Sequence, residues 1–156
     1  MVLYLDPQQS NITRNCARFM VTVRKDYAEA ERLYLMALEL EPKNAKLTGN
    51  MAHFMKTVRK DYDEAERLYR KALELDPKDA DNTGNLAGFM KDVRKDYDEA
   101  ERLYKKALEL DPKHANNTGN FALFMETVRK DYDEAERLYS RALELDTKHA
   151  TITGNY

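Results

Sequence analysis

The stretch VRKDYDEAERLY at residues 58–69 decides the fold, because it recurs unchanged at residues 93–104 and 128–139. A fourth copy at residues 23–34 differs only at Ala28. Each copy starts 35 residues after the previous one, and a fixed period of this length is typical of arrays of short helical repeats. Such arrays present one elongated surface of equivalent positions, which favours binding of other macromolecules.

The third repeat illustrates the helical pattern. Its apolar residues from Leu86 to Val93 follow the spacing i, i+1, i+3, i+4 and i+7, which predicts a first amphipathic helix. Asp96 followed by Glu99 is typical of a helix start, and Pro112 predicts the end of that second helix. The second helix is expected to bury Tyr97, Ala100, Leu103, Tyr104, Ala107, Leu108 and Leu110.

Each repeat is therefore predicted to be a helical hairpin with apolar stripes too wide for one partner helix to cover. Alanines recur at the positions of Ala87, Ala100 and Ala107, where two backbones have to approach closely, while Phe89 and Tyr104 fill the spaces between helices. The pattern predicts an all-α solenoid of antiparallel helix hairpins, in which neighbouring repeats complete each other's core.

The whole chain, residues 1–156, is interpreted as one repeat array. Its repeats are expected at residues 8–42, 43–77, 78–112 and 113–147, with partial repeats at 1–7 and 148–156. Neither partial repeat has the polar face of a terminal cap, so the ends predict head-to-tail stacking of chains into a homo-oligomer.

The charge balance argues against nucleic acid and membranes as partners. The chain has 26 basic and 28 acidic side chains and a pI near 6.0, so it lacks the excess of cations that drives binding to nucleic acid. Its apolar runs are too short to suggest a membrane span. One cysteine, Cys16, allows no internal disulfide, which favours a reducing, cytoplasmic compartment.

The repeats resemble the tetratricopeptide family along the length of the chain. The closest matches are Asp96-Tyr97-Asp98-Glu99-Ala100, then Tyr104, Ala107 and the ending Leu108-Glu109-Leu110-Asp111-Pro112. The resemblance implies a right-handed superhelix of hairpins. Thr83, Ala87 and Lys95 depart from the family pattern, and one extra residue is placed near Val93 to Lys95, between the helices. The pentatricopeptide family, which binds single-stranded RNA, has the same period, but its usual first helix is missing here.

The motif Thr-Gly-Asn is the most unusual recurrent feature, because all three residue types are poor helix formers. It occurs at residues 48–50, 83–85, 118–120 and 153–155. The resemblance implies that the first helices line a concave groove and that asparagines at these positions point into it. A ladder of side-chain amides can bond to the backbone of an extended peptide, and the adjacent glycine leaves room for that backbone. The ladder consists of Asn15, Asn50, Asn85, Asn120 and Asn155.

Two other interpretations of these residues stay open. Threonine can cap a shortened first helix that Gly-Asn begins, with no ligand implied. Family members that grip a terminal carboxylate use basic side chains at positions that include Gly49, Gly84 and Gly119 here, which disfavours that clamp.

Positions that vary between repeats are expected to set specificity for the ligand. Arg18, His53, Lys56 and Lys91 make part of the predicted groove basic, which favours an acidic peptide segment or a terminal carboxylate. The other varying positions are Gly88 and Leu123, Val21 and Glu126, and Lys46, Asp81 and Asn116.

No residue pattern indicates catalysis. His53, His114 and His149 lie far apart, the latter two in expected links, so no metal site is predicted. Cys16 occupies an apolar stripe position and is expected to be a buried thiol. The serines lack a nearby histidine.

The sequence therefore predicts a scaffold without enzymatic activity, cofactor or metal, which binds an extended peptide of a protein partner through the asparagine ladder. The alternative is a self-assembling or engineered repeat array without a dedicated ligand.

Overall fold

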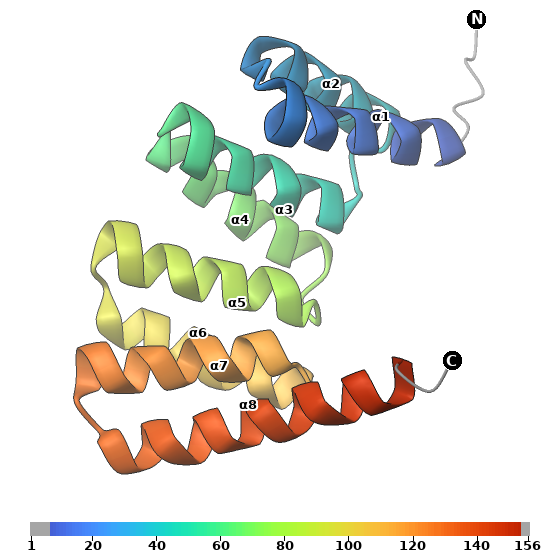
Figure 1. Ribbon diagram of the computed structural model, residues 1–156. Helices are drawn as coiled ribbons and strands as arrows, with labels where there is room; N and C mark the ends of the chain where they lie inside the picture. Colours follow the sequence, from blue (N-terminus) through green and yellow to red (C-terminus); the bar gives the residue numbers. More distant parts are fainter. Residues whose placement is uncertain (1–6, 154–156) are drawn as a thin grey trace, which may run out of the picture. The chain divides into compact units, whose positions relative to one another are not determined.

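The computed structural model describes the backbone of residues 7–153, and its regular structure there is helical throughout (Figure 1). Four hairpins follow one another, and in each a first helix runs into a five-residue π-helical turn before the second helix begins. The first helices are α1 (Pro7–Phe19), α3 (Ala45–Phe54), α5 (Ala80–Phe89) and α7 (Ala115–Phe124). The second helices are α2 (Tyr27–Leu40), α4 (Tyr62–Leu75), α6 (Tyr97–Leu110) and α8 (Tyr132–Thr153). The all-α hairpin architecture expected from the sequence is confirmed.

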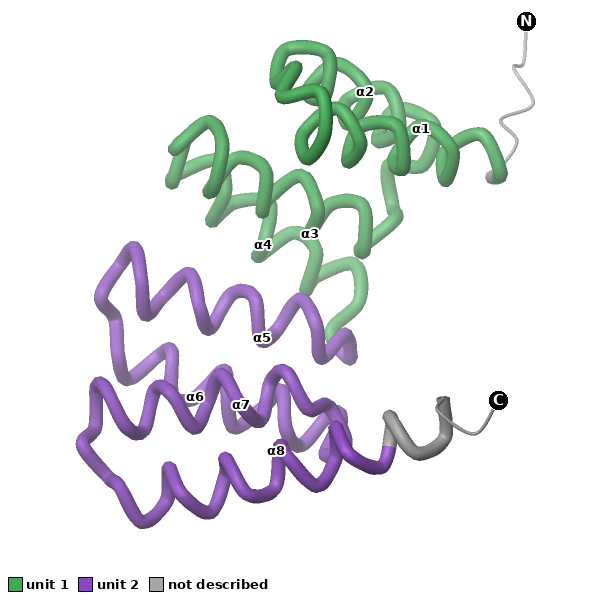
Figure 2. Tube along the Cα trace, viewed as in Figure 1, with its two compact units in different colours: residues 1–77 green, residues 78–156 purple. Residues whose placement is uncertain are grey.

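The chain divides into two compact units of two hairpins each (Figure 2). Unit 1 spans Met1–Pro77 and unit 2 spans Lys78–Tyr156. Within unit 1, α3 packs against α2 of the preceding hairpin. Within unit 2, α7 packs against α6 in the same way and also contacts α5. In both units the second hairpin therefore covers the first one.

Aspartates start the second helices, as the sequence predicts. Asp26, Asp61 and Asp96 each precede a second helix and accept a hydrogen bond from the backbone N–H three residues later, at 3.1 to 3.2 Å. Asp131 accepts the same bond at 3.1 Å. Each cap satisfies a donor that has no partner within the helix.

The link between the two helices of a hairpin absorbs the one extra residue of each repeat. In the third repeat, η3 (Met90–Arg94) is π-helical, and Lys95 follows it in the left-handed conformation with φ 58°. Asp96 then donates its backbone N–H to Met90 O at 3.0 Å, which closes the turn. A π-helical turn carries one residue more than the α-helical turn that it replaces. The extra residue thus lies where the sequence analysis placed it. The equivalent turns are η1 (Met20–Arg24), η2 (Met55–Arg59) and η4 (Met125–Arg129).

The core follows the predicted stripes, except that Val93, Leu108 and Leu110 are only half-buried and two further expectations are wrong. Ala87, Ala100 and Ala107 have no exposed surface, and Phe89 and Tyr104 are buried beside them. Tyr97 was expected to be buried but is 37% exposed, because it is the first residue of its helix and has no preceding turn to pack against. The thiol of Cys16 was expected to be buried and is only half-buried.

In each unit, an arginine of the recurring motif ties the second hairpin to the first. Arg129 donates to Asp98 at 2.7 Å and to Glu101 at 3.3 Å, both on α6, while its guanidinium lies 5.5 Å from the centre of the Phe124 ring. Arg59 likewise bonds to Glu31 of α2. These residues are thus used by the fold.

The two expected partial repeats fall at the limits of the structure. Residues 1–6, interpreted as the end of a second helix, lie outside the described residues. Helix α8 continues without a break to Thr153 and passes through the point where the sequence predicts a link before residue 148. Thr147 stands where the earlier repeats have Pro42, Pro77 and Pro112, so the backbone at that point keeps its hydrogen-bond donor.

Candidate peptide-binding face

The threonines of the Thr-Gly-Asn motif lie inside the first helices. Helices α3, α5 and α7 begin at Ala45, Ala80 and Ala115, and their cap residues are Asn44, Asp79 and His114. Thr83 is buried one turn later and donates its hydroxyl hydrogen bond to Asp79 O at 2.8 Å. Thr48 and Thr118 make the same bond at 2.9 Å. The interpretation of threonine as the helix cap is therefore wrong.

Gly84 of the motif serves close packing between two repeats. It is buried, and a Cβ atom at this position would lie 2.1 Å from Asn117 Oδ1 of the next repeat. Asn117 is itself buried and donates from Nδ2 to Ala80 O at 3.0 Å. At Gly84, the room that the sequence analysis reserved for a ligand backbone is therefore filled by the protein itself.

The asparagines that follow these glycines lie on a row of solvent-facing positions, which we call the asparagine stripe. On each first helix the row contains four residues spaced by four, three and four positions, which places them on one helix face. All members are exposed except Asn50 and Gly88, which are half-buried. The members are Asn11, Asn15, Arg18 and Thr22; Lys46, Asn50, His53 and Thr57; Asp81, Asn85, Gly88 and Asp92; and Asn116, Asn120, Leu123 and Thr127.

The four described asparagines of the ladder are not used by the fold. The side chains of Asn15, Asn50, Asn85 and Asn120 form no hydrogen bond with any other described residue. The fifth, Asn155, lies outside the described part of the chain. An amide that keeps its donors and acceptor facing solvent can offer them to a ligand.

The basic residues predicted to set specificity differ in their surroundings. Arg18 and His53 lie on the asparagine stripe and are exposed, whereas Lys56 and Lys91 lie one position before its last member and are half-buried. Lys91 Nζ is 3.3 Å from Asp92 Oδ1, so its charge is partly neutralised. Although part of the His53 side chain is exposed, the rest lies against neighbouring atoms, and this partial burial lowers its pKa. The positive charge of Lys56 lowers the pKa further.

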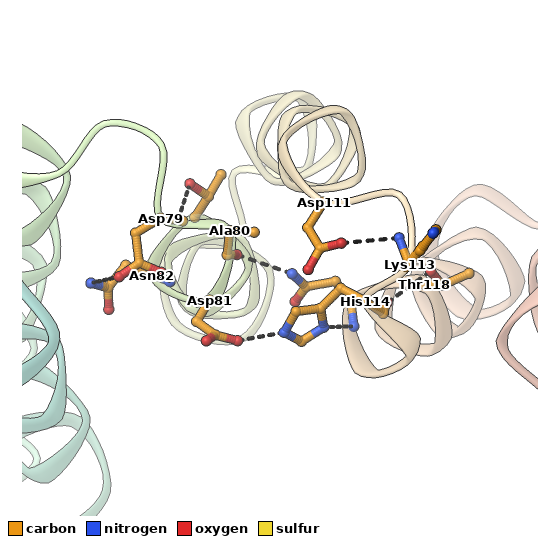
Figure 3. A network of polar contacts seen from close by, with 10 residues as sticks. Asp79, Ala80, Asp81, Asn82, Asp111, Lys113, His114 and Thr118 are labelled. Carbon is orange, nitrogen blue, oxygen red and sulfur yellow. Dashed lines mark hydrogen bonds and ion pairs between the residues drawn. The ribbon is translucent and has the colours of Figure 1, made fainter. Parts of the chain in front are cut away.

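Two functional features escaped the sequence analysis. The first is the last member of the asparagine stripe on each first helix, namely Thr22, Thr57, Asp92 and Thr127. It lies four positions after the position of Arg18 and His53, so the helical spacing alone could have predicted it. The second feature joins two repeats: His114 Nε2 lies 2.5 Å from Asp81 Oδ1, and Figure 3 shows the two side chains directed at each other.

His114 also caps α7, although the sequence analysis placed it in a link between repeats. Its Nδ1 accepts a hydrogen bond from the backbone N–H of Asn117 at 3.2 Å, so the neutral ring with its proton on Nε2 satisfies both contacts. Figure 3 shows this cluster at the start of α5 and α7. These contacts hold α5 and α7 of unit 2 together. The residue spacing within a single repeat could not predict them, because they join two repeats.

The described residues contain neither a candidate metal site nor a candidate membrane-spanning helix. In that part of the chain, no group of three or more histidine, cysteine, aspartate or glutamate side chains is arranged to hold a metal ion. None of the described helices combines the length and apolar character needed to cross a membrane.

Comparison with protein families identifies two kinds of repeat. A model described as tetratricopeptide repeat matches residues 58–79 and 88–114. A model described as Sel1 repeat matches residues 21–41 and 116–146. No curated protein matches the chain. The tetratricopeptide resemblance predicted from the sequence is thus confirmed, and the Sel1 match adds a second type of helical repeat.

Solved structures of this type share the fold. The structure titled as the functional characterisation of Pseudomonas aeruginosa pilF has a TM-score of 0.77 and 23% identity, over 90% of this chain and 62% of that one. The crystal structure of MamA has a TM-score of 0.71 and 18% identity, over 94% of this chain and 83% of that one. The first TPR of Spaghetti (RPAP3), bound to the HSP90 peptide SRMEEVD, has a TM-score of 0.67 and 20% identity, over 82% of this chain and 99% of that one.

Proposed function

We propose that this array of tetratricopeptide and Sel1 repeats is a non-enzymatic scaffold that binds an extended peptide segment of a protein partner along its asparagine stripes. The observation that carries the proposal is the set of four ladder amides. They recur on one face of the first helices, face solvent, and make no hydrogen bond with other described side chains or backbone groups.

The chemistry of the amide explains why asparagine suits this task. Each side chain offers two donor hydrogens and one acceptor oxygen, which match the C=O and N–H groups of a peptide backbone irrespective of its side chains. In unit 2 the stripes of α5 and α7 belong to helices that contact each other, so one peptide can meet Asn85 and Asn120 together. In unit 1 the corresponding pair is Asn15 and Asn50.

A related fold supports peptide binding as the mode of action. The RPAP3 repeat structure has the same fold and carries a short bound peptide. The present chain differs in its residues, so the identity of that peptide is not transferred. What supports a peptide ligand here is the unused row of amides on an equivalent helical scaffold.

An alanine variant tests the ladder. Replacing Asn50, Asn85 and Asn120 together by alanine should abolish binding to the motif that a peptide library selects with the wild-type chain, and leave the helical circular dichroism unchanged. Glu74→Ala with Glu109→Ala is a matched control, because both residues are exposed on second helices. Wild-type affinity of the asparagine variant rejects the proposed ladder.

A second candidate function is head-to-tail association, and exposed apolar residues favour it. On α8, Leu143 is 68% exposed, whereas the equivalent Leu108 is half-buried. On α1, Ile12 is 61% and Phe19 is 42% exposed, although the equivalent Leu47 and Phe54 are buried. A stack of α1 on α8 of a second copy would repeat the contact that α7 makes with α6.

Sedimentation at several concentrations tests this association. The wild-type chain should form larger species as its concentration rises, and Leu143→Lys should shift it toward the monomer, because a lysine at the contact has to lose its hydration. Lys105→Leu, on the outer face of α6, controls for apolar adhesion in general. A monomer at every concentration rejects this function and leaves peptide binding unaffected.

A further inference from the structure

We infer that the two units differ in their affinity for acidic peptides: unit 1 binds an acidic, Asp/Glu-rich segment through its asparagine stripes, and unit 2 does not. This inference rests on the proposed peptide binding and adds the chemical class of the ligand. Its basis is the distribution of charge along the first helices.

The first helices of unit 1 contain no acidic residue. Residues 7–24 and 45–59, which cover α1 with η1 and α3 with η2, include neither aspartate nor glutamate. They contain seven basic or potentially basic residues, namely Arg14, Arg18, Arg24, Lys46, His53, Lys56 and Arg59. Figure 1 shows α1 and α3 in front of their partner helices α2 and α4.

The cations on the stripe of unit 1 are available to a ligand. Arg18 and Lys46 are exposed, and neither side chain forms an ion pair or hydrogen bond with another described residue. By contrast, Arg59 at the end of η2 is bound to Glu31 of the preceding repeat. Arg18 and Lys46 flank Asn15 and Asn50 at three and four positions along their helices, which puts amide and charge on the same face.

The equivalent positions of unit 2 carry the opposite charge. Asp81 stands at the position of Lys46, and Asp92 at the position of Thr57, while Gly88 and Leu123 replace Arg18 and His53. Both aspartates are exposed, and the one half-buried lysine nearby, Lys91, is paired with Asp92. An acidic peptide that binds unit 1 through attraction would therefore meet repulsion on the stripe of unit 2.

A peptide fits this face better than a nucleic acid, the other common polyanion. The chain as a whole has more acidic than basic side chains, so counterion release from a phosphate backbone gives little free energy. The ladder amides of unit 1, Asn15 and Asn50, each offer the donors and the acceptor that pair with the C=O and N–H groups of a peptide backbone. Single-stranded RNA serves as the contrasting ligand in the test.

The test uses short fluorescein-labelled peptides and the full chain. The peptides alternate Glu with Ala, Gln with Ala, or Lys with Ala, and each has an amidated C-terminus so that no terminal carboxylate contributes. The Glu peptide should bind most tightly. A free-acid copy of the Gln peptide and a labelled oligouridine complete the set, and fluorescence anisotropy at low salt measures all affinities.

Charge-reversal variants assign the binding to unit 1. Arg18→Glu with Lys46→Glu should weaken the Glu peptide at least about tenfold, since each exposed charge contact contributes up to about 1 kcal/mol and reversal turns attraction into repulsion. Lys43→Glu with Lys71→Glu makes the same change in net charge on a link and a second helix, and should have little effect. Asp81→Lys with Asp92→Thr gives unit 2 the residues of Lys46 and Thr57 and should strengthen binding.

The outcomes separate this inference from the proposed function. Equal affinity for the Glu, Gln and Lys peptides, or equal loss in both charge-reversal variants, overturns the charge selectivity and leaves the asparagine ladder standing. Binding only of the free-acid copy assigns the cations to a terminal carboxylate and overturns the inference, as does tighter binding of oligouridine. If none of the peptides binds and a peptide library also selects nothing, the proposed function itself fails.

Discussion

At the scale of single residues, Gly84 and Gly119 make a pair in which the same substitution should have opposite effects. A Cβ atom at Gly84 would meet the buried side chain of Asn117 at 2.1 Å, whereas at Gly119 the nearest atom is the Ala142 Cβ at 4.0 Å. Gly84→Ala should destabilise the protein by roughly 1–3 kcal/mol, the usual range for an overfilled site. Gly119→Ala should stabilise it by up to about 1 kcal/mol through helix propensity.

Urea unfolding followed by circular dichroism measures both changes. Adding Asn117→Ala to Gly84→Ala should recover part of the lost stability, because it removes the atom that clashes. If Gly84→Ala unfolds at the same urea concentration as Gly119→Ala, the close contact with Asn117 is not a feature of the folded protein.

The glycines and threonines of the Thr-Gly-Asn motif show which structural features cannot be predicted from the pattern of a single repeat. The sequence indicates that Thr-Gly-Asn is costly in a helix, but the reason for Gly84 is a side chain in the next repeat, 33 positions away at Asn117. The interpretation of the threonine as a cap, which the sequence left open beside the ladder, assumes a shortened first helix. Asp79, four residues earlier, is a better cap acceptor and sets the true start.

The stability of the protein should depend on pH through His53, and the surroundings of the ring determine the direction of this dependence. Burial and Lys56 lower its pKa from the ordinary value of 6.5, so the folded protein binds this proton less readily than the unfolded chain. The stability linked to His53 is therefore complete above pH 6.5 and decreases as the pH falls below that value. An acidic peptide on unit 1 should raise the pKa of His53, because it favours the charged ring.

NMR titration of the histidine rings checks this prediction. The His53 signal should titrate below pH 6.5 in the free protein and at higher pH with the amidated Glu peptide bound. His53→Gln identifies the signal and should remove its share of the acid-induced loss of stability. A His53 pKa that does not move on saturation with the peptide contradicts a ligand site beside this ring.

At the scale of elements, the turn between the two helices of each hairpin contains a residue under strain. Lys25, Lys60, Lys95 and Lys130 all have φ between 57° and 59°, a conformation that costs residues with a Cβ about 1–2 kcal/mol. Lys95 is one of the positions at which the repeat departs from the tetratricopeptide pattern. The turn nevertheless forms, because its backbone bond from Asp96 to Met90 closes the π-helical turn.

Lys95→Gly should therefore stabilise the protein by roughly 0.5–1 kcal/mol, since glycine adopts this conformation without strain but has more entropy to lose on folding. Lys105→Gly in the middle of α6 is the control and should cost about 1 kcal/mol. Thermal unfolding of both variants gives the comparison. A lower midpoint for Lys95→Gly than for the wild type would mean that lysine makes a compensating contact at this turn.

The elements themselves were largely predictable from the sequence. Asp96 as a cap, Pro112 after the end of a helix and the alanines between helices depend on local rules, and the structure confirms them. Tyr97 is exposed because the helix starts at that residue. Hydrophobic periodicity does not locate a helix start to within one residue. The uninterrupted course of α8 follows from Thr147, which lacks the helix-ending chemistry of proline.

At the scale of the whole molecule, the repeats are nearly identical in the second helices and differ in the first. The recurring motif maintains the caps, the turn and the arginine contacts between repeats. The variation is concentrated on the asparagine stripe, where unit 1 carries Arg18 and Lys46 and unit 2 carries Asp81 and Asp92. The position of the asparagines was predictable from their period, and the ladder that they are proposed to form stays a prediction. The contacts of Lys91 with Asp92 and of Asp81 with His114 were not predictable from the sequence, because the pairing of these side chains depends on the folded chain.

Salt should separate the two candidate functions of the molecule. Raising the salt concentration from about 0.1 M to about 1 M shortens the range of electrostatic attraction from about 10 Å to about 3 Å. Binding of the Glu peptide to the exposed Arg18 and Lys46 should therefore weaken strongly. Association through Ile12, Phe19 and Leu143 should not weaken, because burial of apolar surface depends little on screening. Anisotropy and sedimentation across this range measure the two processes on the same sample, with Arg18→Gln and Lys46→Gln, which remove the charges without reversing them, as the reference for peptide binding with little salt dependence. If association falls with salt as steeply as peptide binding, charged contacts rather than the apolar faces of α1 and α8 hold the chains together.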